Sequence, residues 1–364
     1  MSHVIGIDVG TSGIKVGAMN KEGVLGYLEY EPYSLLYPQN GWVEIQLEET
    51  WTKVKELLIK VWTEVEKIGE VDAISLSSFC NSSVFLDSDG EPLYNGIMYL
   101  DQRSKKETAI IKEVIGEEAI FDITKNRMEP GMYTVTTHLW FKEQFPDLYR
   151  KTHKWGNLST YLLNKLTGQF VLDWTQASFS GMYDVVEYTW STEILERLNI
   201  EMEKLPKVVD PSAIVGDLAL RETFLKSVPV IAGAADTACS TLALGVQPNE
   251  LFESVGTSNV LTVCTDNPNI LDERFLNRCH VVKNQWLSHG AMSFPGASIQ
   301  WFYEQFLAEN HSKDILDDLL NDSHIGSSGI FFLPYMKGER TPIWDPDARG
   351  VFAGIQLHST KADM

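Results

Sequence analysis

The sequence predicts an α/β protein of two domains, and three observations support that fold class. The chain has 364 residues, which is more than one average domain. Apolar residues make up 44% of it, enough to bury a sizeable core. Stretches with the alternation of strands are interleaved with stretches that have the spacing of helices. Mixed elements at this density are typical of α/β folds.

The first elements are expected to form an antiparallel meander of three strands. Residues 4–9 are rich in β-formers and lead into a Gly-rich turn at 10–13. Residues 14–18 alternate again, residues 20–23 make a second turn, and the third strand begins near Val24.

The rest of the first domain alternates between helix and strand patterns. Apolar residues from Trp51 to Val65 recur at the spacing of one helix face. The run after Leu86 contains a Ser-Asp-Gly turn and is interpreted as the return arm of a hairpin. In chain order, the expected elements are a helix over 48–68, a strand over 71–77, the hairpin over 84–100, helices over 105–120 and 160–167, a strand over 228–233 and a helix over 238–244.

An internal repeat divides the chain. The tetrapeptide Val-Gly-Thr-Ser occurs at 9–12 and again at 255–258, each time between β-rich segments. A duplicated strand–turn–strand unit therefore opens each domain. We expect a first domain over 1–245 and the start of a second over 246–364. Much less chain follows the second copy than separates the two copies, so the second domain is expected to be incomplete and the chain to be truncated.

The charge and the cysteines exclude several classes of function. A formal net charge of −20 repels nucleic acid and anionic membranes, although a local pocket can still hold a small anionic ligand. None of the four cysteines belongs to a C-x-x-C pair, and no histidines have zinc spacing. A reduced, cytoplasmic protein is expected, without a signal peptide or an apolar run of the ~20 residues that span a bilayer. A homodimer is compatible with these observations.

The two Gly-Thr-Ser turns carry candidate phosphate ligands. Consecutive backbone N–H groups and hydroxyls in a short turn make a concavity that suits phosphate oxygens, and glycine lets the backbone approach the ligand. Two such turns on facing domains would hold a triphosphate between them, although each turn taken alone is more often a plain hairpin. The candidate residues are Gly10, Thr11 and Ser12 in the first turn and Gly256, Thr257 and Ser258 in the second.

Two carboxylates and one lysine complete the chemistry expected from the residues alone. Asp8 ends the first strand just before the first turn, where it can hold Mg²⁺ through waters beside the phosphates. Lys15 on the next strand adds positive charge, or is simply a solvated strand residue. Asp236 follows an apolar strand, and burial there would raise its pKa towards that of a general base. From the local sequence alone, a helix N-cap is the better interpretation of Asp236.

Six segments in the right order make the chain resemble the FGGY family of carbohydrate kinases. They are residues 7–12 with Lys15, 99–103, 163–168 with Asp173 and 177–178, 233–236, 254–258, and 338–342 with 345–354. The resemblance implies two actin-like domains of the ribonuclease-H type that close over a cleft. It also implies ATP as the donor and a sugar or polyol hydroxyl as the acceptor, with Asp236 as the base that takes the proton of that hydroxyl.

The resemblance further implies a set of acceptor-binding residues, which are Phe79, Cys80, Asn81, Asp101, Arg103, Tyr133, Asp236 and Thr237. The loop that contains Phe79, Cys80 and Asn81 stands where xylulokinase-like members usually carry Gln-Met-His. That edge of the pocket is therefore more apolar, with Asn81 as its main hydrogen-bonding group. Thr237 stands where Asn or Gln is frequent, and Thr137 where lysine is common. The sugar stays open among xylulose-, gluconate- and other polyol-type substrates.

Two other functions fit parts of the pattern. A non-catalytic, actin-like nucleotide-dependent regulator would share the two turns and Asp8 but would need no acceptor base. An inactive sugar-binding remnant would keep the acceptor residues without a complete donor site, and this chain alone would then have little kinase activity. Asp236 together with Asp101 and Arg103 favours the kinase, because a regulator need not keep a polar acceptor pocket.

Overall fold

The computed structural model of the chain describes residues 2–220, 223–224, 226–255, 259–307, 314–336, 338–345 and 347–364. The chain divides into two compact units. The first consists of Met1–Val246, Asp266–Ile270 and Asn277–Leu287, and the second of Gln247–Thr265, Leu271–Leu276 and Ser288–Met364.

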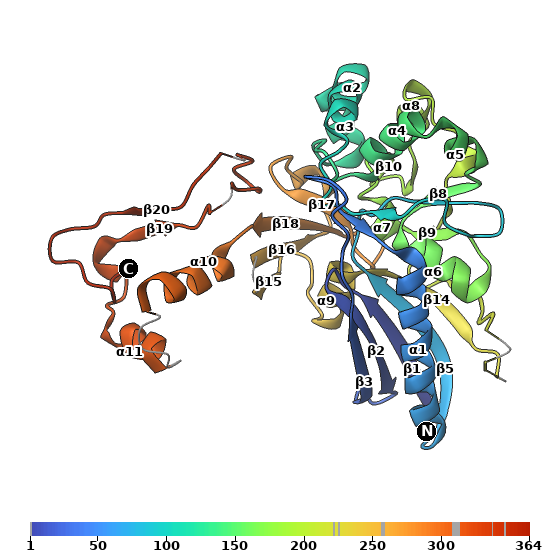
Figure 1. Cartoon of the computed structure of the whole chain (residues 1–364), viewed down its shortest axis with the longest axis horizontal. Coiled ribbons are helices and arrows are strands. Elements are labelled where there is room, and N and C mark those ends of the chain that lie inside the picture. Colours follow the sequence, from blue (N-terminus) through green and yellow to red (C-terminus); the bar gives the residue numbers. More distant parts are fainter. Residues whose placement is uncertain are drawn as a thin grey trace. The chain divides into compact units, whose positions relative to one another are not determined.

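A six-stranded sheet in the order β13-β14-β5-β1-β2-β3 forms the centre of the first unit (Figure 1). Strands β1 (Ser2–Val9), β2 (Gly13–Asn20) and β3 (Leu25–Pro32) pair antiparallel, which confirms the expected meander. Strands β5 (Glu70–Ser78) and β14 (Pro229–Ala235) run parallel to β1. The carboxyl ends of β1, β5 and β14 therefore meet at one edge of the sheet, where ligands of such sheets commonly bind.

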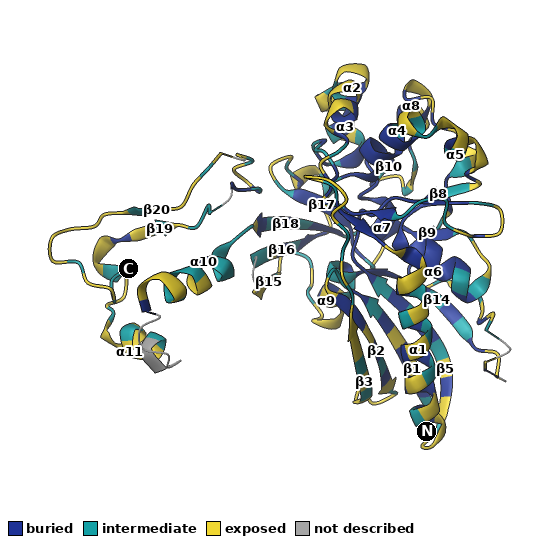
Figure 2. Cartoon of the chain, in the orientation of Figure 1, coloured by how far each residue is buried: buried dark blue, intermediate teal, exposed yellow. Residues whose placement is uncertain are grey.

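Two helices cover the sheet with apolar faces. Helices α1 (Leu47–Glu66) and α6 (Leu158–Thr167) pack against its strands and against each other, and both were expected from helical spacing. Val54 and Leu58 of α1 and Leu162 of α6 are fully buried in the core between these elements. Figure 2 shows many of the buried residues of this unit gathered around α7 and β9.

The other elements of the first unit are short. They are β4 (Glu44–Ile45), β6 (Val84–Leu86), β7 (Gly96–Ile97), α2 (Lys105–Ile115), α3 (Glu117–Thr124), α4 (Thr134–Gln144), α5 (Pro146–Lys151), β8 (Lys154–Gly156), β9 (Val171–Asp173), α7 (Trp174–Ala177), β10 (Tyr183–Asp184), β11 (Thr189–Trp190), α8 (Thr192–Arg197), η1 (Met202–Lys204), β12 (Lys207–Val209), β13 (Ile214–Asp217), α9 (Asp236–Ala243) and η2 (Pro268–Ile270).

Two expected elements differ from the structure. The helix expected over 105–120 is two helices, α2 and α3, because Gly116 between them has a φ of +91°, outside the helical region. In the hairpin expected over 84–100, the ladder partner of β6 is β8 rather than the return arm. Among the described residues, the return arm makes isolated bridges to Ser83 and to Leu86 of β6. Its own strand, β7, pairs with β4 instead. Strand pairing between distant segments leaves no mark on local sequence, which is why the hairpin was expected.

The second unit begins with strands β15 (Leu251–Val255) and β16 (Asn259–Thr265), which pair antiparallel with Val255 opposite Asn259. These strands confirm the second pair of strands that the repeat predicts, whereas Gly256, Thr257 and Ser258, which lie between them in the sequence, are outside the described residues. Strands β15, β16, β18 (Trp286–Met292) and β17 (Leu276–Cys279) form a sheet in that order, and β17 and β18 contain residues of both units. The remaining elements are α10 (Pro295–Phe302), η3 (Tyr303–Leu307), α11 (Asp314–Asp322), η5 (Ser327–Gly329), β19 (Phe331–Leu333) and β20 (Val351–Ala353).

Among the helices that the structure describes, none combines the length and the apolar character needed to cross a membrane.

Candidate active site

The first Gly-Thr-Ser turn joins β1 to β2 at the edge where the parallel strands end. The amide of Gly10 donates to the carbonyl of Gly13 at 3.0 Å and closes the turn. The antiparallel register places Lys15 opposite Asp8, and Lys15 Nζ lies 3.6 Å from Asp8 Oδ2. Both side chains are more than one-third exposed, so the structure brings the expected carboxylate and lysine together beside the turn, in contact with solvent.

Two tyrosines that sequence reasoning missed brace this turn. The hydroxyl of Tyr33 donates to the carbonyl of Gly10, and that of Tyr30 donates to the carbonyl of Ser12 at 3.3 Å. A Cβ atom at Gly13 would lie 2.5 Å from the ring of Tyr30, so that ring would have to move if Gly13 carried a side chain. Tyrosines at every third position, Tyr27, Tyr30 and Tyr33, were the available signal. The tyrosine hydroxyls bind carbonyls of the turn, and the structure records no partner for the amides and hydroxyls of Thr11 and Ser12 among the described residues, so these groups can bind a ligand.

Asp8 is suited to a metal that keeps most of its water. Its Oδ1 accepts a hydrogen bond from Ser77 of β5 at 3.0 Å, which orients the carboxylate. In the parts of the chain that the structure describes, no three His, Cys, Asp or Glu side chains cluster closely enough to hold a metal ion. One oriented, partly exposed carboxylate next to a phosphate turn fits Mg²⁺, which commonly binds through one or two carboxylates, substrate phosphates and water.

Asp236 lies at the same edge, at the start of the helix that follows β14. It is the first residue of α9, and the N-cap position belongs to Ala235, so the alternative of an N-cap is wrong for Asp236. Its Oδ1 accepts from the amide of Thr237 at 2.6 Å and from the hydroxyl of Thr237 at 3.1 Å. Burial raises the pKa of Asp236, whereas the guanidinium of Arg278 and the bonds from Thr237 lower that pKa, and Asp8 raises it further. The net effect is a raised pKa, as a general base requires.

The backbone before Asp236 is held in place from two sides. Gly233 has a φ of +73°, and a Cβ atom there would lie 1.6 Å from the carbonyl oxygen of Leu76 in β5. Only glycine therefore allows β14 to approach β5 at this point. On the other side, the hydroxyl of Thr175 in α7 accepts a hydrogen bond from the amide of Ala235 at 2.8 Å. The same hydroxyl donates a hydrogen bond to Oδ1 of Asp173. This chain of bonds gives Asp173 a positioning role that its place in the sequence did not reveal.

The loop after β5 supplies the expected acceptor residues. Phe79 is 2% exposed and belongs to the hydrophobic core, and Cys80 is also buried. Asn81 has a φ of +66°, an uncommon value for a residue with a side chain. Its Nδ2 donates to the carbonyl of Met132, and its buried Oδ1 has no partner among the described residues. Of the three, Asn81 is the one with an unsatisfied polar atom.

Tyr133 stands close to this loop through the bond between Asn81 and Met132. It is fully buried, and its hydroxyl has no partner within the described parts of the chain. Gly131 lets the segment that precedes Tyr133 lie directly against Asp101, since a Cβ atom at Gly131 would lie 1.9 Å from the carbonyl oxygen of Asp101.

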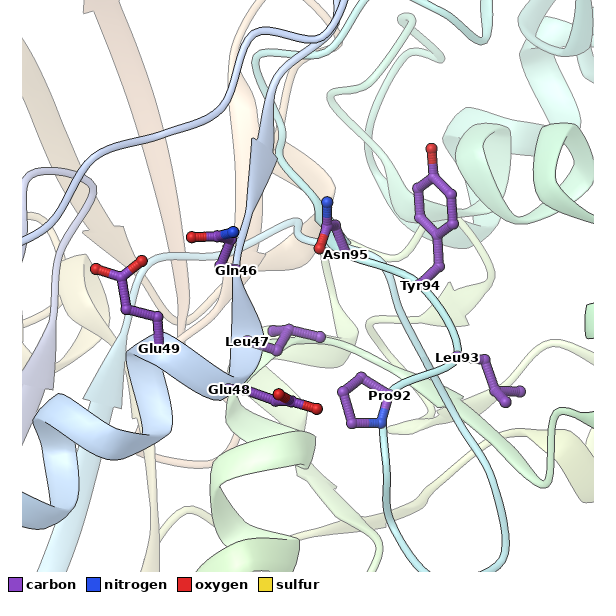
Figure 3. A pocket seen from close by; sticks show the side chains of 8 residues that line it. All are labelled: Gln46, Leu47, Glu48, Glu49, Pro92, Leu93, Tyr94 and Asn95. Atoms are coloured by element: carbon purple, nitrogen blue, oxygen red, sulfur yellow. The ribbon is translucent and has the colours of Figure 1, made fainter.

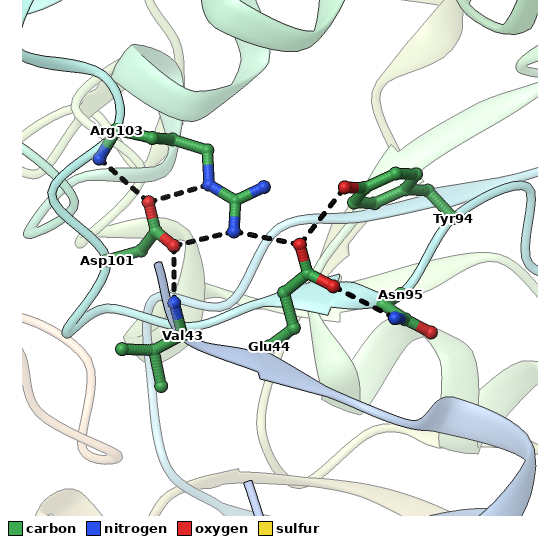
Figure 4. A network of polar contacts seen from close by, with 6 residues as sticks. All are labelled: Val43, Glu44, Tyr94, Asn95, Asp101 and Arg103. Atoms are coloured by element: carbon green, nitrogen blue, oxygen red, sulfur yellow. Dashed lines mark hydrogen bonds and ion pairs between the residues drawn. The ribbon is translucent and has the colours of Figure 1, made fainter. Parts of the chain in front are cut away.

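Asp101 and Arg103 bind each other rather than standing free (Figure 4). Nε and Nη2 of Arg103 donate to the two oxygens of Asp101 at 2.8 and 2.7 Å, and Nη2 also donates to Glu44 at 2.9 Å. The guanidinium lies 3.7 Å from the ring centre of Trp42 and 4.8 Å from that of Trp140. In the described structure, Nη1 is the side-chain nitrogen of Arg103 that lacks a partner. It is therefore the atom of Arg103 that can still donate a hydrogen bond to a bound substrate.

A hollow of about 430 Å³ lies beside this network, between the start of α1 and the segment 92–95 (Figure 3). It shares Tyr94 and Asn95 with the network, whose side chains donate to Glu44. Its charged lining residues are Glu48 and Glu49, which repel phosphate. None of the expected site residues lines it, so we do not place the reaction there.

Sequence reasoning also missed Arg278, which lies beside the expected acceptor residues. It lies in β17, within the part of that strand that belongs to the first unit. Its Nη1 donates to Sγ of Cys80 at 3.1 Å, and its guanidinium lies 4.2 Å from the ring centre of Phe179. It also lowers the pKa of Asp236. A cation therefore stands next to the expected acceptor residues and the expected base.

Comparison with known proteins identifies the family. The model of the FGGY family of carbohydrate kinases, N-terminal domain, matches residues 3–243, and that of the C-terminal domain matches residues 251–364. A xylulose kinase of Staphylococcus xylosus is 30% identical over 372 residues, which is 100% of this chain and 76% of that protein.

Solved structures agree with that match. The xylulose kinase of Lactobacillus acidophilus has a TM-score of 0.90 and 28% identity, over 100% of this chain and 74% of that one. The gluconate kinase of the same species has a TM-score of 0.91 and 27% identity, with the same coverage. The expected α/β fold with two actin-like domains is thereby confirmed.

Proposed function

The chain belongs to the FGGY family of carbohydrate kinases, and from that premise we propose that it transfers a phosphoryl group from ATP to a hydroxyl of a xylulose- or gluconate-type acceptor, with Asp236 as the general base. One observation carries the proposal. Asp236, with a raised pKa, lies at the same sheet edge as the phosphate turn and Asp8. A base, a phosphate cradle and a metal carboxylate are the three parts that phosphoryl transfer to an alcohol needs.

The reaction is a displacement at phosphorus. The acceptor oxygen forms a bond to the γ-phosphorus while the bond to the bridging oxygen of ADP breaks, and Asp236 takes the proton of the hydroxyl. The raised pKa makes Asp236 a stronger proton acceptor than an exposed aspartate. Gly233 and Thr175 hold the backbone from which Asp236 projects, so the base is positioned before the acceptor arrives.

On the donor side, Gly10, Thr11 and Ser12 would receive phosphate oxygens and Lys15 would add positive charge. The corresponding proposal for Gly256, Thr257 and Ser258 falls on residues outside those described. Asp8 would hold Mg²⁺ through water, and when bound this ion neutralises negative charge on the phosphates.

On the acceptor side, three buried polar atoms without partners in the described structure support binding of a polyhydroxy compound. They are Oδ1 of Asn81, the hydroxyl of Tyr133 and Nη1 of Arg103. Buried polar groups are ordinarily hydrogen-bonded, so groups left unpaired are candidates for substrate hydroxyls. Thr237 holds Asp236, and Phe79 and Cys80 form the apolar edge.

An ADP-release assay of the full-length protein tests the proposal. The panel contains ketoses, polyols and sugar acids, each with Mg²⁺ and ATP. We expect acceptor-dependent ADP release that falls by about 10²–10⁴-fold in Asp236→Asn. Asp147→Asn, which alters an exposed carboxylate of α5, should behave as the unaltered protein. Undiminished turnover by Asp236→Asn would show that Asp236 is not the general base.

A further inference from the structure

We propose that Arg278 binds the carboxylate of a sugar-acid acceptor and so selects sugar acids over neutral sugars and polyols. This inference rests on the proposed function and assigns the acceptor class of the same site. The acceptor carries a carboxylate at one end, held by Arg278, and the hydroxyl that receives the phosphoryl group near Asp236.

The guanidinium of Arg278 is a buried cation that pairs with no carboxylate among the described residues. The residue is 8% exposed, and no ion pair joins it to an acidic side chain in the part of the chain that the structure describes. Nη1 has only the sulfur of Cys80, a weak acceptor, and Nε is enclosed with no partner among the described residues. Buried arginines are ordinarily paired, because an unpaired buried charge is costly. An anionic group of a bound ligand would therefore supply the partner that this guanidinium needs.

Stacking on Phe179 leaves the donor edge of this guanidinium free. The centre of the guanidinium lies 4.2 Å from the ring centre, a distance at which the ring holds the group through its face. A face contact uses none of the five N–H groups of an arginine. A planar carboxylate matches two of them at once, which makes it the acceptor that such an edge binds best among organic oxygen groups.

The backbone on both sides of Arg278 is anchored within the first unit. The amide of Asn277 donates to Oδ1 of Asn126 at 2.8 Å, and Nδ2 of Asn126 donates back to the carbonyl of Asn277 at 2.8 Å. The amide of Cys279 donates to the hydroxyl of Ser178 at 3.3 Å. Arg278 is thus held in advance of ligand binding, as selective sites require.

The neighbours of Arg278 place it on the acceptor side of the site. Cys80 precedes Asn81, whose Oδ1 has no partner in the described parts of the chain, and Arg278 lies near enough to Asp236 to lower the pKa of Asp236. The chain carries a net charge of −20, so an anionic acceptor is repelled by the protein as a whole. A dedicated buried cation offsets that repulsion, whereas a neutral ketose or polyol would leave the guanidinium unpaired.

The test measures binding and turnover with matched acceptors. Calorimetric titration of the full-length protein uses aldonates of five and six carbons and the alditols of the same length, and ADP release is measured with the same compounds. The variants are Arg278→Met and Arg278→Lys. Arg274→Met is the control, because Arg274 is exposed and already paired with Asp272. We expect Arg278→Met to weaken aldonate binding by roughly 10- to 100-fold, as for a charged hydrogen bond, and alditol binding by less than about threefold.

The outcomes separate this inference from the proposed function. Aldonate binding that is lost in Arg278→Met supports the inference even without ADP release, which would count against the proposed function alone. Turnover of alditols in preference to aldonates, unchanged by Arg278→Met, would overturn the inference and leave the proposed kinase function standing. If Arg278→Met does not fold, the preference of the unaltered protein for aldonates and its partial retention in Arg278→Lys decide the question.

Discussion

Replacing Asp101 by alanine should lower the free energy of unfolding of the first unit by about 3–5 kcal/mol, the usual cost of breaking a buried ion pair from one side. Asp101 is fully buried and accepts four hydrogen bonds, from the amide of Val43 at 2.6 Å and from three nitrogens of Arg103 at 2.7–2.9 Å. In the variant, the guanidinium keeps only its bond to Glu44. The two flanking tryptophan rings are present in both forms and do not offset the loss.

Urea unfolding, followed by tryptophan fluorescence and by circular dichroism, measures this change. Asp101→Asn keeps one acceptor oxygen and should lie between alanine and the unaltered protein. Asp147→Ala removes an exposed carboxylate paired with Arg150 and should change stability by less than about 1 kcal/mol. The reasoning is refuted if Asp101→Ala unfolds normally and raises only the KM for the acceptor. Asp101 would then be an acceptor ligand and not the support of Arg103.

Three further substitutions test the site. Asp236→Asn should abolish phosphoryl transfer but leave the affinity for ATP, measured by titration, nearly unchanged, because the base contacts the acceptor; weaker ATP binding would contradict that placement. Asp8→Ala should raise the Mg²⁺ concentration needed for half-maximal turnover, and an identical Mg²⁺ titration would leave Asp8 with a structural role only. Gly233→Ala should destabilise the first unit by about 2–5 kcal/mol in thermal or urea unfolding, since the new methyl group meets Leu76 in a left-handed conformation. Normal stability of Gly233→Ala would mean that β14 moves away from Leu76 and makes room for the methyl group.

The features predicted correctly from the sequence are those that local chemistry records. Strand alternation and Gly-rich turns predicted the meander, and apolar spacing predicted α1 and α6, because burial of one face leaves that pattern in the sequence. The repeated tetrapeptide predicted a second pair of strands, β15 and β16. The prediction that Asp236 follows an apolar strand is also confirmed, since it comes directly after β14.

What local sequence could not supply were contacts between distant segments. The ladder partner of β6 is β8, which lies well beyond the expected hairpin. Asp101 and Arg103 were expected to face the acceptor, but their separation of two residues also lets them pair with each other, and burial beside Glu44 favours that pairing. Arg278 comes after the start of the second unit in the sequence but packs in the first unit. The spacing of residues in the sequence therefore gave no sign that Arg278 lies beside the acceptor-binding residues.

The closeness of Arg278 and Asp236 couples acceptor binding to the strength of the base. In the free site, burial and Asp8 raise the pKa of Asp236, while Arg278 and the bonds from Thr237 lower it. A carboxylate bound to Arg278 would neutralise the arginine's charge and raise that pKa further, because the lowering influence is removed. As the proposed general base, Asp236 must be deprotonated, so activity is expected to fall as the pH drops through this pKa. For an aldonate, the acidic limb of the kcat profile, which reports the complex, should therefore lie at higher pH than the limb of kcat/KM, which reports the free protein. Neutral acceptors should show no such separation, and coincident limbs for both acceptors would mean that Arg278 and Asp236 are not coupled.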